Sequence, residues 1–149
     1  MSLLGDYEDG NVFCQIIRHV EPCFKVYEDE ATLASLDIYP QAEGHTLVIP
    51  KNVRSRNILD IPHEELRLLT KTVQLVARAV TIGMRSDGIE VQQLNGSAAG
   101  QTVFHLHFHI IPRRHGISLT PHGHAKRASD NELRVVSARV RSGFVDVAH

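Results

Sequence analysis

Apolar residues recur with helical spacing in three segments of the chain, which are residues 11–19, residues 62–83 and a segment that begins at Ser129. The second segment starts at Pro62, a residue that the first turn of a helix tolerates. Ser129 followed by Glu132 matches a capping box, which predicts the start of the third helix. The apolar stripes of these helices consist of Val12, Phe13, Ile16, Ile17 and Val20; of Leu66, Leu69, Val73, Val76, Ala77 and Val80; and of Leu133, Val136 and Val140.

Shorter apolar runs predict the strands of a sheet. Residues 25–28 and 32–36 are separated by an acidic pair and suit a hairpin. Because the strands mostly follow one another, with one long helix inserted among them, the pattern predicts an α+β fold with an antiparallel sheet, one long helix and shorter flanking helices. The other predicted strands are residues 46–49, 89–94 and 102–111, a turn-rich loop covers residues 95–100, and residues 113–127 are irregular.

Composition and charge exclude several classes of protein. With 149 residues, of which 42% are hydrophobic and 22% charged, the chain suits one compact globular domain. A net charge of −1 argues against electrostatic binding of nucleic acid, and no apolar run approaches the roughly 20 residues of a membrane helix. Residues 1–10 lack the features of a signal peptide, and Cys14 and Cys23 form no CxxC motif. We therefore expect a cytoplasmic protein with neither a membrane nor a nucleic-acid partner.

The most informative run of residues contains three of the ten histidines. His105, His107 and His109 alternate with apolar residues, so in a strand the imidazoles would line one face at intervals of roughly 6.5–7 Å. A generic solvent-facing strand rarely uses histidine. A row of groups that titrate near pH ~6.5 indicates nucleophilic, acid–base or metal chemistry.

Two interpretations of this row differ in what surrounds the histidines. Two histidines could share a metal ion with His45 as a third ligand, although no Asp or Glu lies between Glu90 and Asp130. Alternatively, one imidazole attacks a phosphorus atom while its neighbours fix its tautomer and protonate the leaving group. The loop of residues 95–102 offers backbone amides and small polar side chains that suit phosphate oxygens.

Five segments together resemble the pattern of the histidine triad (HIT) superfamily, in order and in spacing, from about residue 11 to residue 113. The closest branch by this resemblance is the Hint-like group of small single-domain members. The segments are Phe13–Ile17, Val26–Asp29, Asp37–Ala42, Gly44–Lys51 and the signature Gly100–Arg113.

The resemblance implies a HIT-like fold, a homodimer and a covalent mechanism. By the family pattern, His107 attacks the α-phosphorus of a nucleoside 5′-phosphoramidate or a related adenylate. Water then releases the nucleoside monophosphate from the nucleotidyl-histidine. His105 and His45 fall where the family supports and polarises the nucleophile, and His109 falls where it contacts phosphate or the leaving group. Because an imidazole must be neutral to attack, we expect activity to fall below about pH 6.

The resemblance also implies the residues that hold a purine nucleotide. Asp37 matches the position that binds the ribose hydroxyls, which suits a carboxylate acceptor. The phosphate-loop positions are Asn95, Gln101 and Thr102, and the apolar pocket for the base consists of Val12, Phe13, Ile16, Leu36 and Ile38.

Some features depart from the family pattern. Asn11 and Val53 stand where certain relatives have zinc ligands, so we expect no metal and no cofactor. The triad is shared with Fhit-like dinucleoside polyphosphate hydrolases, and a nucleotide-binding regulatory module with incidental activity is a further alternative. We expect an N-terminal segment (1–10), a HIT domain core (11–113) and a C-terminal extension (114–149) packed on the same domain. The histidines of that extension, His122 among them, are interpreted as part of a solvated loop.

Overall fold

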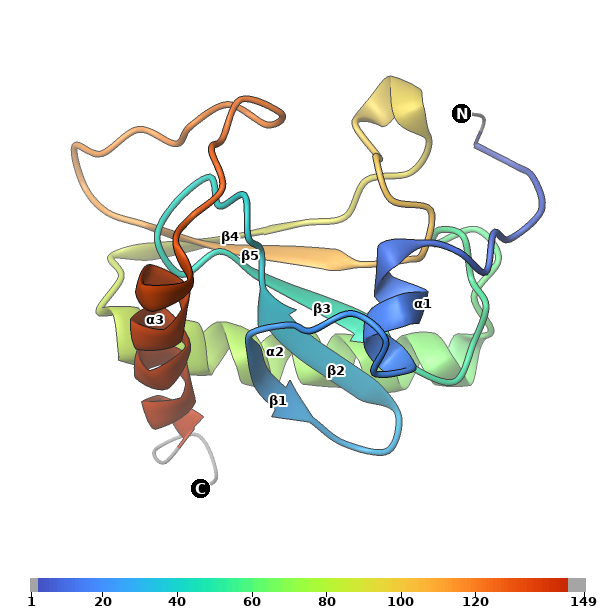
Figure 1. The fold of residues 1–149 in the computed structure, drawn as a ribbon, viewed down its shortest axis with the longest axis horizontal. Coiled ribbons are helices and arrows are strands. Elements are labelled where there is room, and N and C mark those ends of the chain that lie inside the picture. The colour runs from blue at the N-terminus through green and yellow to red at the C-terminus, as the bar shows by residue number, and fades with distance from the viewer. Residues whose placement is uncertain (1–2, 145–149) are drawn as a thin grey trace.

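The computed structural model describes residues 3–144 of the chain. A five-stranded antiparallel sheet runs in the order β1-β2-β3-β5-β4, with helices on both of its faces (Figure 1). This architecture confirms the α+β fold. The strands are β1 (Lys25–Glu28), β2 (Thr32–Leu36), β3 (Thr46–Pro50), β4 (Gly88–Gln92) and β5 (Phe108–Arg113). The helices are α1 (Val12–Ile17), α2 (His63–Met84) and α3 (Asp130–Ser142), with a short 3-10 turn, η1 (Ser97–Ala99).

The helices begin close to where the sequence predicts them. α2 follows Pro62, and the hydroxyl of Ser129 accepts the backbone N–H of Glu132 at the start of α3. α1 is shorter than the predicted segment of residues 11–19. It ends at Ile17 because His19 adopts a left-handed conformation with φ 61°, which a helix does not allow. Val20, expected in the apolar stripe, therefore lies beyond the helix and is exposed.

The two faces of the sheet bury different sets of side chains. On one face, α2 packs its apolar stripe against Val48 and Ile110 in the main core. On the other face, Phe13 of α1 packs against Leu33 and Leu47 in a smaller cluster. Because side chains alternate along a strand, His109, which pairs with Leu47 across β3 and β5, lies on the α1 face. The functional side chains therefore gather on the face opposite to α2.

The strand predicted over residues 102–111 forms only in its second half, as β5. Its pairing with β3 stops because the Pro50 carbonyl accepts a hydrogen bond from the His105 ring, while the Leu106 N–H donates to Ser55. His105 and His107 therefore lie on the loop before the strand. The expected row of three imidazoles on one strand face is wrong.

α3 packs against α2 through a close backbone approach. A Cβ atom on Gly83 would lie 2.2 Å from the Arg139 carbonyl oxygen, and one on Gly143 would lie 2.1 Å from the Ala79 carbonyl oxygen. Both positions therefore need glycine.

Between β5 and α3 the chain is irregular over residues 114–129, in agreement with the sequence analysis. Thr120 and Gln41 exchange two hydrogen bonds, and the Ala128 N–H donates to the Ile38 carbonyl. These bonds hold the segment against the loop between β2 and β3.

No helix within residues 3–144 is both long and apolar enough to cross a membrane. Residues 1–2 of the expected N-terminal segment and residues 145–149 of the expected C-terminal extension lie outside the described residues.

Candidate active site

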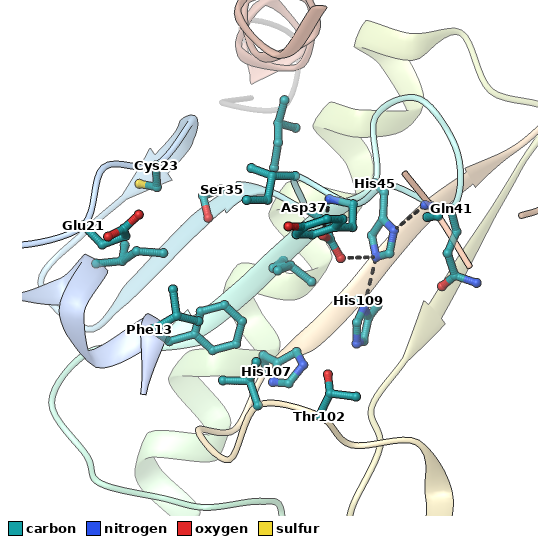
Figure 2. Close-up of a pocket in the computed structure, with 18 of the residues that line it drawn as sticks. Phe13, Glu21, Cys23, Ser35, Asp37, Gln41, His45, Thr102, His107 and His109 are labelled. Atoms are coloured by element: carbon teal, nitrogen blue, oxygen red, sulfur yellow. Dashed lines mark hydrogen bonds and ion pairs between the residues drawn. The ribbon is translucent and has the colours of Figure 1, made fainter. Parts of the chain in front are cut away.

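A cavity of about 470 Å³ opens on the α1 face of the sheet. It is lined by α1, by β2 and β3 with the loop between them, by the loop that precedes β5, and by the irregular segment 114–129. Figure 2 shows its two ends. Glu21, Cys23 and Ser35 lie at one end, the histidines lie at the other, and the Phe13 ring lies between them.

His107 is held so that one ring nitrogen remains for a ligand. Its Nδ1 lies 2.8 Å from the carbonyl oxygen of His105, and because a carbonyl only accepts, Nδ1 carries the proton. Nε2 of the neutral ring then keeps its lone pair. Burial lowers the pKa of His107 to about 4, so the ring is neutral at pH 7.

His109 has the opposite tautomer, because a chain of hydrogen bonds from Gln41 fixes it. The Gln41 backbone N–H donates to His45 Nδ1 at 3.1 Å, so the neutral His45 ring carries its proton on Nε2. His45 Nε2–H donates to His109 Nδ1 at 2.9 Å, which leaves the proton of neutral His109 on Nε2. Burial lowers the pKa of His45 to about 4 and that of His109 to about 3, so both rings are neutral at pH 7.

These two tautomers give the cavity a nucleophile and an acid side by side. The ring centroids of His107 and His109 lie 4.9 Å apart, and both residues line the cavity. One ring offers a lone pair and the other offers an N–H donor. This combination suits attack on an electrophile together with protonation of its leaving group.

His105 does not line the cavity but supports the nucleophile from behind. Its ring is buried, with Nε2–H donating to the Pro50 carbonyl at 2.9 Å and Nδ1 accepting the Tyr7 hydroxyl at 2.6 Å. Burial lowers the pKa of His105 to about 4. The residue acts on His107 through its backbone carbonyl, while His45 contacts His109 rather than His107.

Asp37 lies where the histidine end meets the apolar part of the cavity (Figure 2). One carboxylate oxygen accepts the Tyr39 backbone N–H at 2.9 Å, and the other lies 3.6 Å from His45 Nε2. Burial raises the pKa of this carboxyl group. Its position suits an acceptor for sugar hydroxyl groups.

Of the three expected phosphate-loop residues, only Thr102 lines the cavity. Gln101 is buried beneath the loop, where its side chain bonds the Gly96 N–H and the Arg56 carbonyl. The Asn95 side chain bonds the Ile58 N–H and the Gln93 side chain. These two residues therefore hold the loop in place. The amides of residues 99–101 donate to carbonyls within the loop and are already used.

All five residues expected to contact the base line the cavity. Beyond them, at the end of the cavity away from the histidines, lie the polar groups of Glu21, Cys23 and Ser35, which were not predicted to contact the base (Figure 2). Burial raises the pKa of the Cys23 thiol, so it is not a reactive thiolate. The apolar residues are Val12, Phe13, Ile16, Leu36 and Ile38.

Within the described part of the chain, Asp37, His45 and His109 form a group that could hold a metal ion, with ligand atoms all within 4.8 Å of one another. Two nitrogen ligands on one tetrahedral zinc lie about 3.3 Å apart, given Zn–N distances of about 2.0–2.1 Å. The 2.9 Å between His45 Nε2 and His109 Nδ1 is a hydrogen-bond distance. In this arrangement the His45 and His109 nitrogens are therefore joined by a hydrogen bond and are too close together to bind one zinc ion.

Three residues that contribute to the site could not be found from the sequence, because each acts through the tertiary structure. Tyr7 lies 98 residues from the ring that it contacts, and Gln41 orients His45 through a backbone N–H that any residue type except proline would supply. His122, interpreted as solvated, lines the cavity beside His109. The only signal for His122 was its place in a basic stretch without Asp or Glu.

Solved structures of similar proteins share the fold over nearly the whole chain. A Hit-like protein from Bartonella henselae, described as involved in cell-cycle regulation and solved with an unknown ligand, is 44% identical with a TM-score of 0.85, over 93% of this chain and 99% of that chain. A zinc-bound histidine triad family protein from Mycobacterium smegmatis is 34% identical with a TM-score of 0.80, over 93% of this chain and 96% of that chain.

Curated relatives and a family model match most of the chain. Adenylylsulfatase HINT3 of Arabidopsis thaliana is 41% identical over 69% of this chain, and the match spans 52% of that longer protein. Adenosine 5′-monophosphoramidase HNT1 of Saccharomyces cerevisiae is 43% identical over 76% of this chain and 69% of the yeast protein. The model of the HIT domain family matches residues 18–116, which carry His45, His105, His107 and His109. The chain therefore belongs to the histidine triad superfamily, in its Hint-like branch.

Proposed function

We propose that this protein hydrolyses nucleoside 5′-phosphoramidates or related adenylates at the α-phosphate through a covalent nucleotidyl-His107. The observation that carries the proposal is the pairing of opposite tautomers, with His107 presenting a lone pair and His109 an N–H to one cavity. Binding alone would not require a neutral nucleophile beside a proton donor.

The cavity accommodates a nucleotide in one direction. The purine base packs on the apolar residues that lie away from the histidines, among them Phe13 and Leu36, and the ribose hydroxyls reach Asp37. This order places the α-phosphate at the histidine end, beside Thr102 and His107. The Thr102 hydroxyl is suited to donate a hydrogen bond to a phosphate oxygen.

The reaction proceeds in two steps. The lone pair of His107 Nε2 forms a bond to phosphorus while the bond from phosphorus to the amine nitrogen breaks, and His109 Nε2–H gives its proton to the departing amine. Water then attacks the phosphorus, the N–P bond returns its electron pair to His107, and His109 Nε2 takes the proton from water. The His105 carbonyl accepts the His107 Nδ1–H throughout, so it stabilises the positive charge that develops on the ring.

The named activities of two relatives support an adenylate substrate. The Arabidopsis protein is an adenylylsulfatase and the yeast protein an adenosine 5′-monophosphoramidase. Both names describe cleavage next to the phosphate of an adenylate. We propose that this chain also cleaves the bond next to the phosphate of an adenylate, without a metal ion in the reaction.

The experiment is the release of AMP from adenosine 5′-phosphoramidate, with EDTA present, by the wild type and by His107→Ala. Turnover that tolerates EDTA in the wild type and disappears in the variant is expected. His107→Ala should still bind AMP, because the apolar end and Asp37 are unchanged. His63→Ala is a matched control on the polar face of α2 and should keep full activity. Turnover in His107→Ala, or its loss in EDTA, would contradict the mechanism.

We also propose a homodimer, as the family resemblance implies, formed in the cytoplasm through the edge strand β4. Strand β4 lies at the end of the sheet and exposes Ile89 and Val91. Exposed apolar side chains along an unpaired edge favour pairing with a second copy. Light scattering of the wild type should give twice the chain mass, and Val91→Lys should give a monomer.

A further inference from the structure

His122 occupies the mouth of the cavity at the histidine end. Its Nε2–H donates to the Gly100 carbonyl at 3.0 Å, and its ring is perpendicular to that of His109, with 6.1 Å between the centroids. His122 and Gly123 both line the cavity, although they come from a segment beyond the triad strand. The side chain thus connects the irregular segment 114–129 to the loop before β5.

The segment that carries His122 is anchored beside the proposed acid. Thr120 exchanges two hydrogen bonds with Gln41, whose own backbone N–H orients His45 and through it His109. Gly123 turns the chain back with φ 83° immediately after His122. The position of His122 is therefore set by the same residue that sets the tautomer of His109.

The charge at this end of the cavity differs from that at the base end. Residues 113–129 contain no Asp or Glu. Their arginines are engaged elsewhere: Arg113 faces Glu90, Arg127 faces Asp130, and Arg114 donates to a backbone carbonyl of α2. The carboxylates that line the cavity are Asp37, at the ribose position, and Glu21, at the base end.

We propose that His122 determines specificity for the leaving group and favours an acid, such as sulfate or phosphate, over an amine. The proposal rests on the proposed function, which places the leaving group at this end. With Nε2–H bonded to Gly100, Nδ1 is the nitrogen that remains for a ligand. When the ring carries both protons, its Nδ1–H can donate a charge-assisted hydrogen bond to an anion beside it.

The chemistry explains why an acid and an amine need different partners. When adenosine 5′-phosphosulfate reacts, His107 Nε2 bonds to phosphorus, the bond from phosphorus to the bridging oxygen breaks, and sulfate leaves with the electron pair and needs no proton. An amine leaves only after it takes the His109 proton. Stabilising the departing anion is the task of His122. Water then attacks the phosphorus, and the N–P bond returns its electron pair to His107. Because His109 Nε2 still carries its own proton, the proton that water loses is released to solvent.

The kinetic test compares kcat/KM for adenosine 5′-phosphosulfate and adenosine 5′-phosphoramidate. In His122→Ala, kcat/KM for adenosine 5′-phosphosulfate divided by kcat/KM for adenosine 5′-phosphoramidate should fall about tenfold. This is the effect expected from the loss of one charge-assisted hydrogen bond. His122→Arg, which keeps a cationic donor, should restore most of the ratio. His124→Ala is the matched control, because this residue lies on the same segment and does not line the cavity. Equal losses on both substrates, or an unchanged ratio, would overturn the proposal.

A binding measurement separates this proposal from the proposed function. If the wild type hydrolyses neither substrate, the proposed function fails, and calorimetry of His107→Ala with and without His122→Ala still decides the role of His122. The double variant should bind adenosine 5′-phosphosulfate about tenfold more weakly than the single variant does and should bind AMP equally well. Equal affinity of the two variants for adenosine 5′-phosphosulfate would overturn the inference.

Discussion

His107 and His109 carry their protons on different ring nitrogens, although they are two residues apart in the same motif. The His105 carbonyl accepts Nδ1–H of His107, whereas Nδ1 of His109 accepts from His45. One backbone acceptor and one side-chain donor therefore divide two chemically identical side chains into a nucleophile and an acid.

The division of roles predicts how removal of the acid depends on the leaving group. His109→Ala should lower kcat for adenosine 5′-phosphoramidate by about 10²–10⁴-fold, because the amine then leaves without a proton. The loss should be smaller than about tenfold for the 4-nitrophenyl ester of AMP, whose leaving group needs no proton. His45→Ala should show the same pattern more weakly, since it frees the tautomer of His109. Steady-state kinetics with the two substrates checks this, and equal losses on both would remove His109 from the acid role.

Tyr7 is a positioning residue for the nucleophile, because its hydroxyl donates to the His105 ring whose carbonyl orients His107. Tyr7→Phe should lower kcat roughly three- to tenfold with little change in KM, in line with one hydrogen bond. Tyr27→Phe loses a hydroxyl bond to Asp29 far from the cavity and is the matched control. A raised KM with unchanged kcat in Tyr7→Phe would show that the hydroxyl acts on substrate binding instead.

Activity should fall at a lower pH than the sequence alone predicts. Burial lowers the pKa of His107 to about 4, so the nucleophile stays neutral well below pH 6. We therefore expect kcat/KM to hold down to about pH 5 and to fall toward pH 4. Initial rates taken within seconds of a pH jump would measure this, and a midpoint near 6.5 would contradict the lowered pKa.

Stability should decline over the same acidic range. The four buried histidines have lowered pKa values of about 3 to 4 when folded, whereas the unfolded chain takes up these protons near pH 6.5. Their contribution is complete above pH ~6.5, and each costs up to about 1.4 kcal/mol per pH unit as the pH falls toward 4. Urea unfolding at pH 7, 6 and 5 should show the fall, and replacing His105 by Gln should reduce its slope.

The approach of α3 to α2 predicts a stability effect away from the site. Gly83→Ala places a methyl group 2.2 Å from the Arg139 carbonyl oxygen, so the helices must move apart. We expect a loss of about 1–3 kcal/mol in the free energy of unfolding. At Gly10 an added Cβ meets nothing within 4 Å, and Gly10→Ala should leave the stability nearly unchanged. Chemical denaturation of both variants measures the difference.

The sequence by itself determined the α+β architecture, the long helix and the family, because apolar periodicity, proline positions and the spacing of the HIT signature are local properties. It also pointed to the apolar end of the cavity, since residues of α1 and β2 that match the family pattern do line it.

The tertiary structure alone decided how the histidines divide their tasks. His45 reaches His109 across 64 residues and Tyr7 reaches His105 across 98, so no local pattern encodes these contacts. The three imidazoles do not form the predicted row on a strand, because the Pro50 carbonyl accepts a hydrogen bond from the His105 ring where strand pairing would have continued. A tautomer depends on which donor or acceptor faces each nitrogen, and only the folded chain brings those partners together.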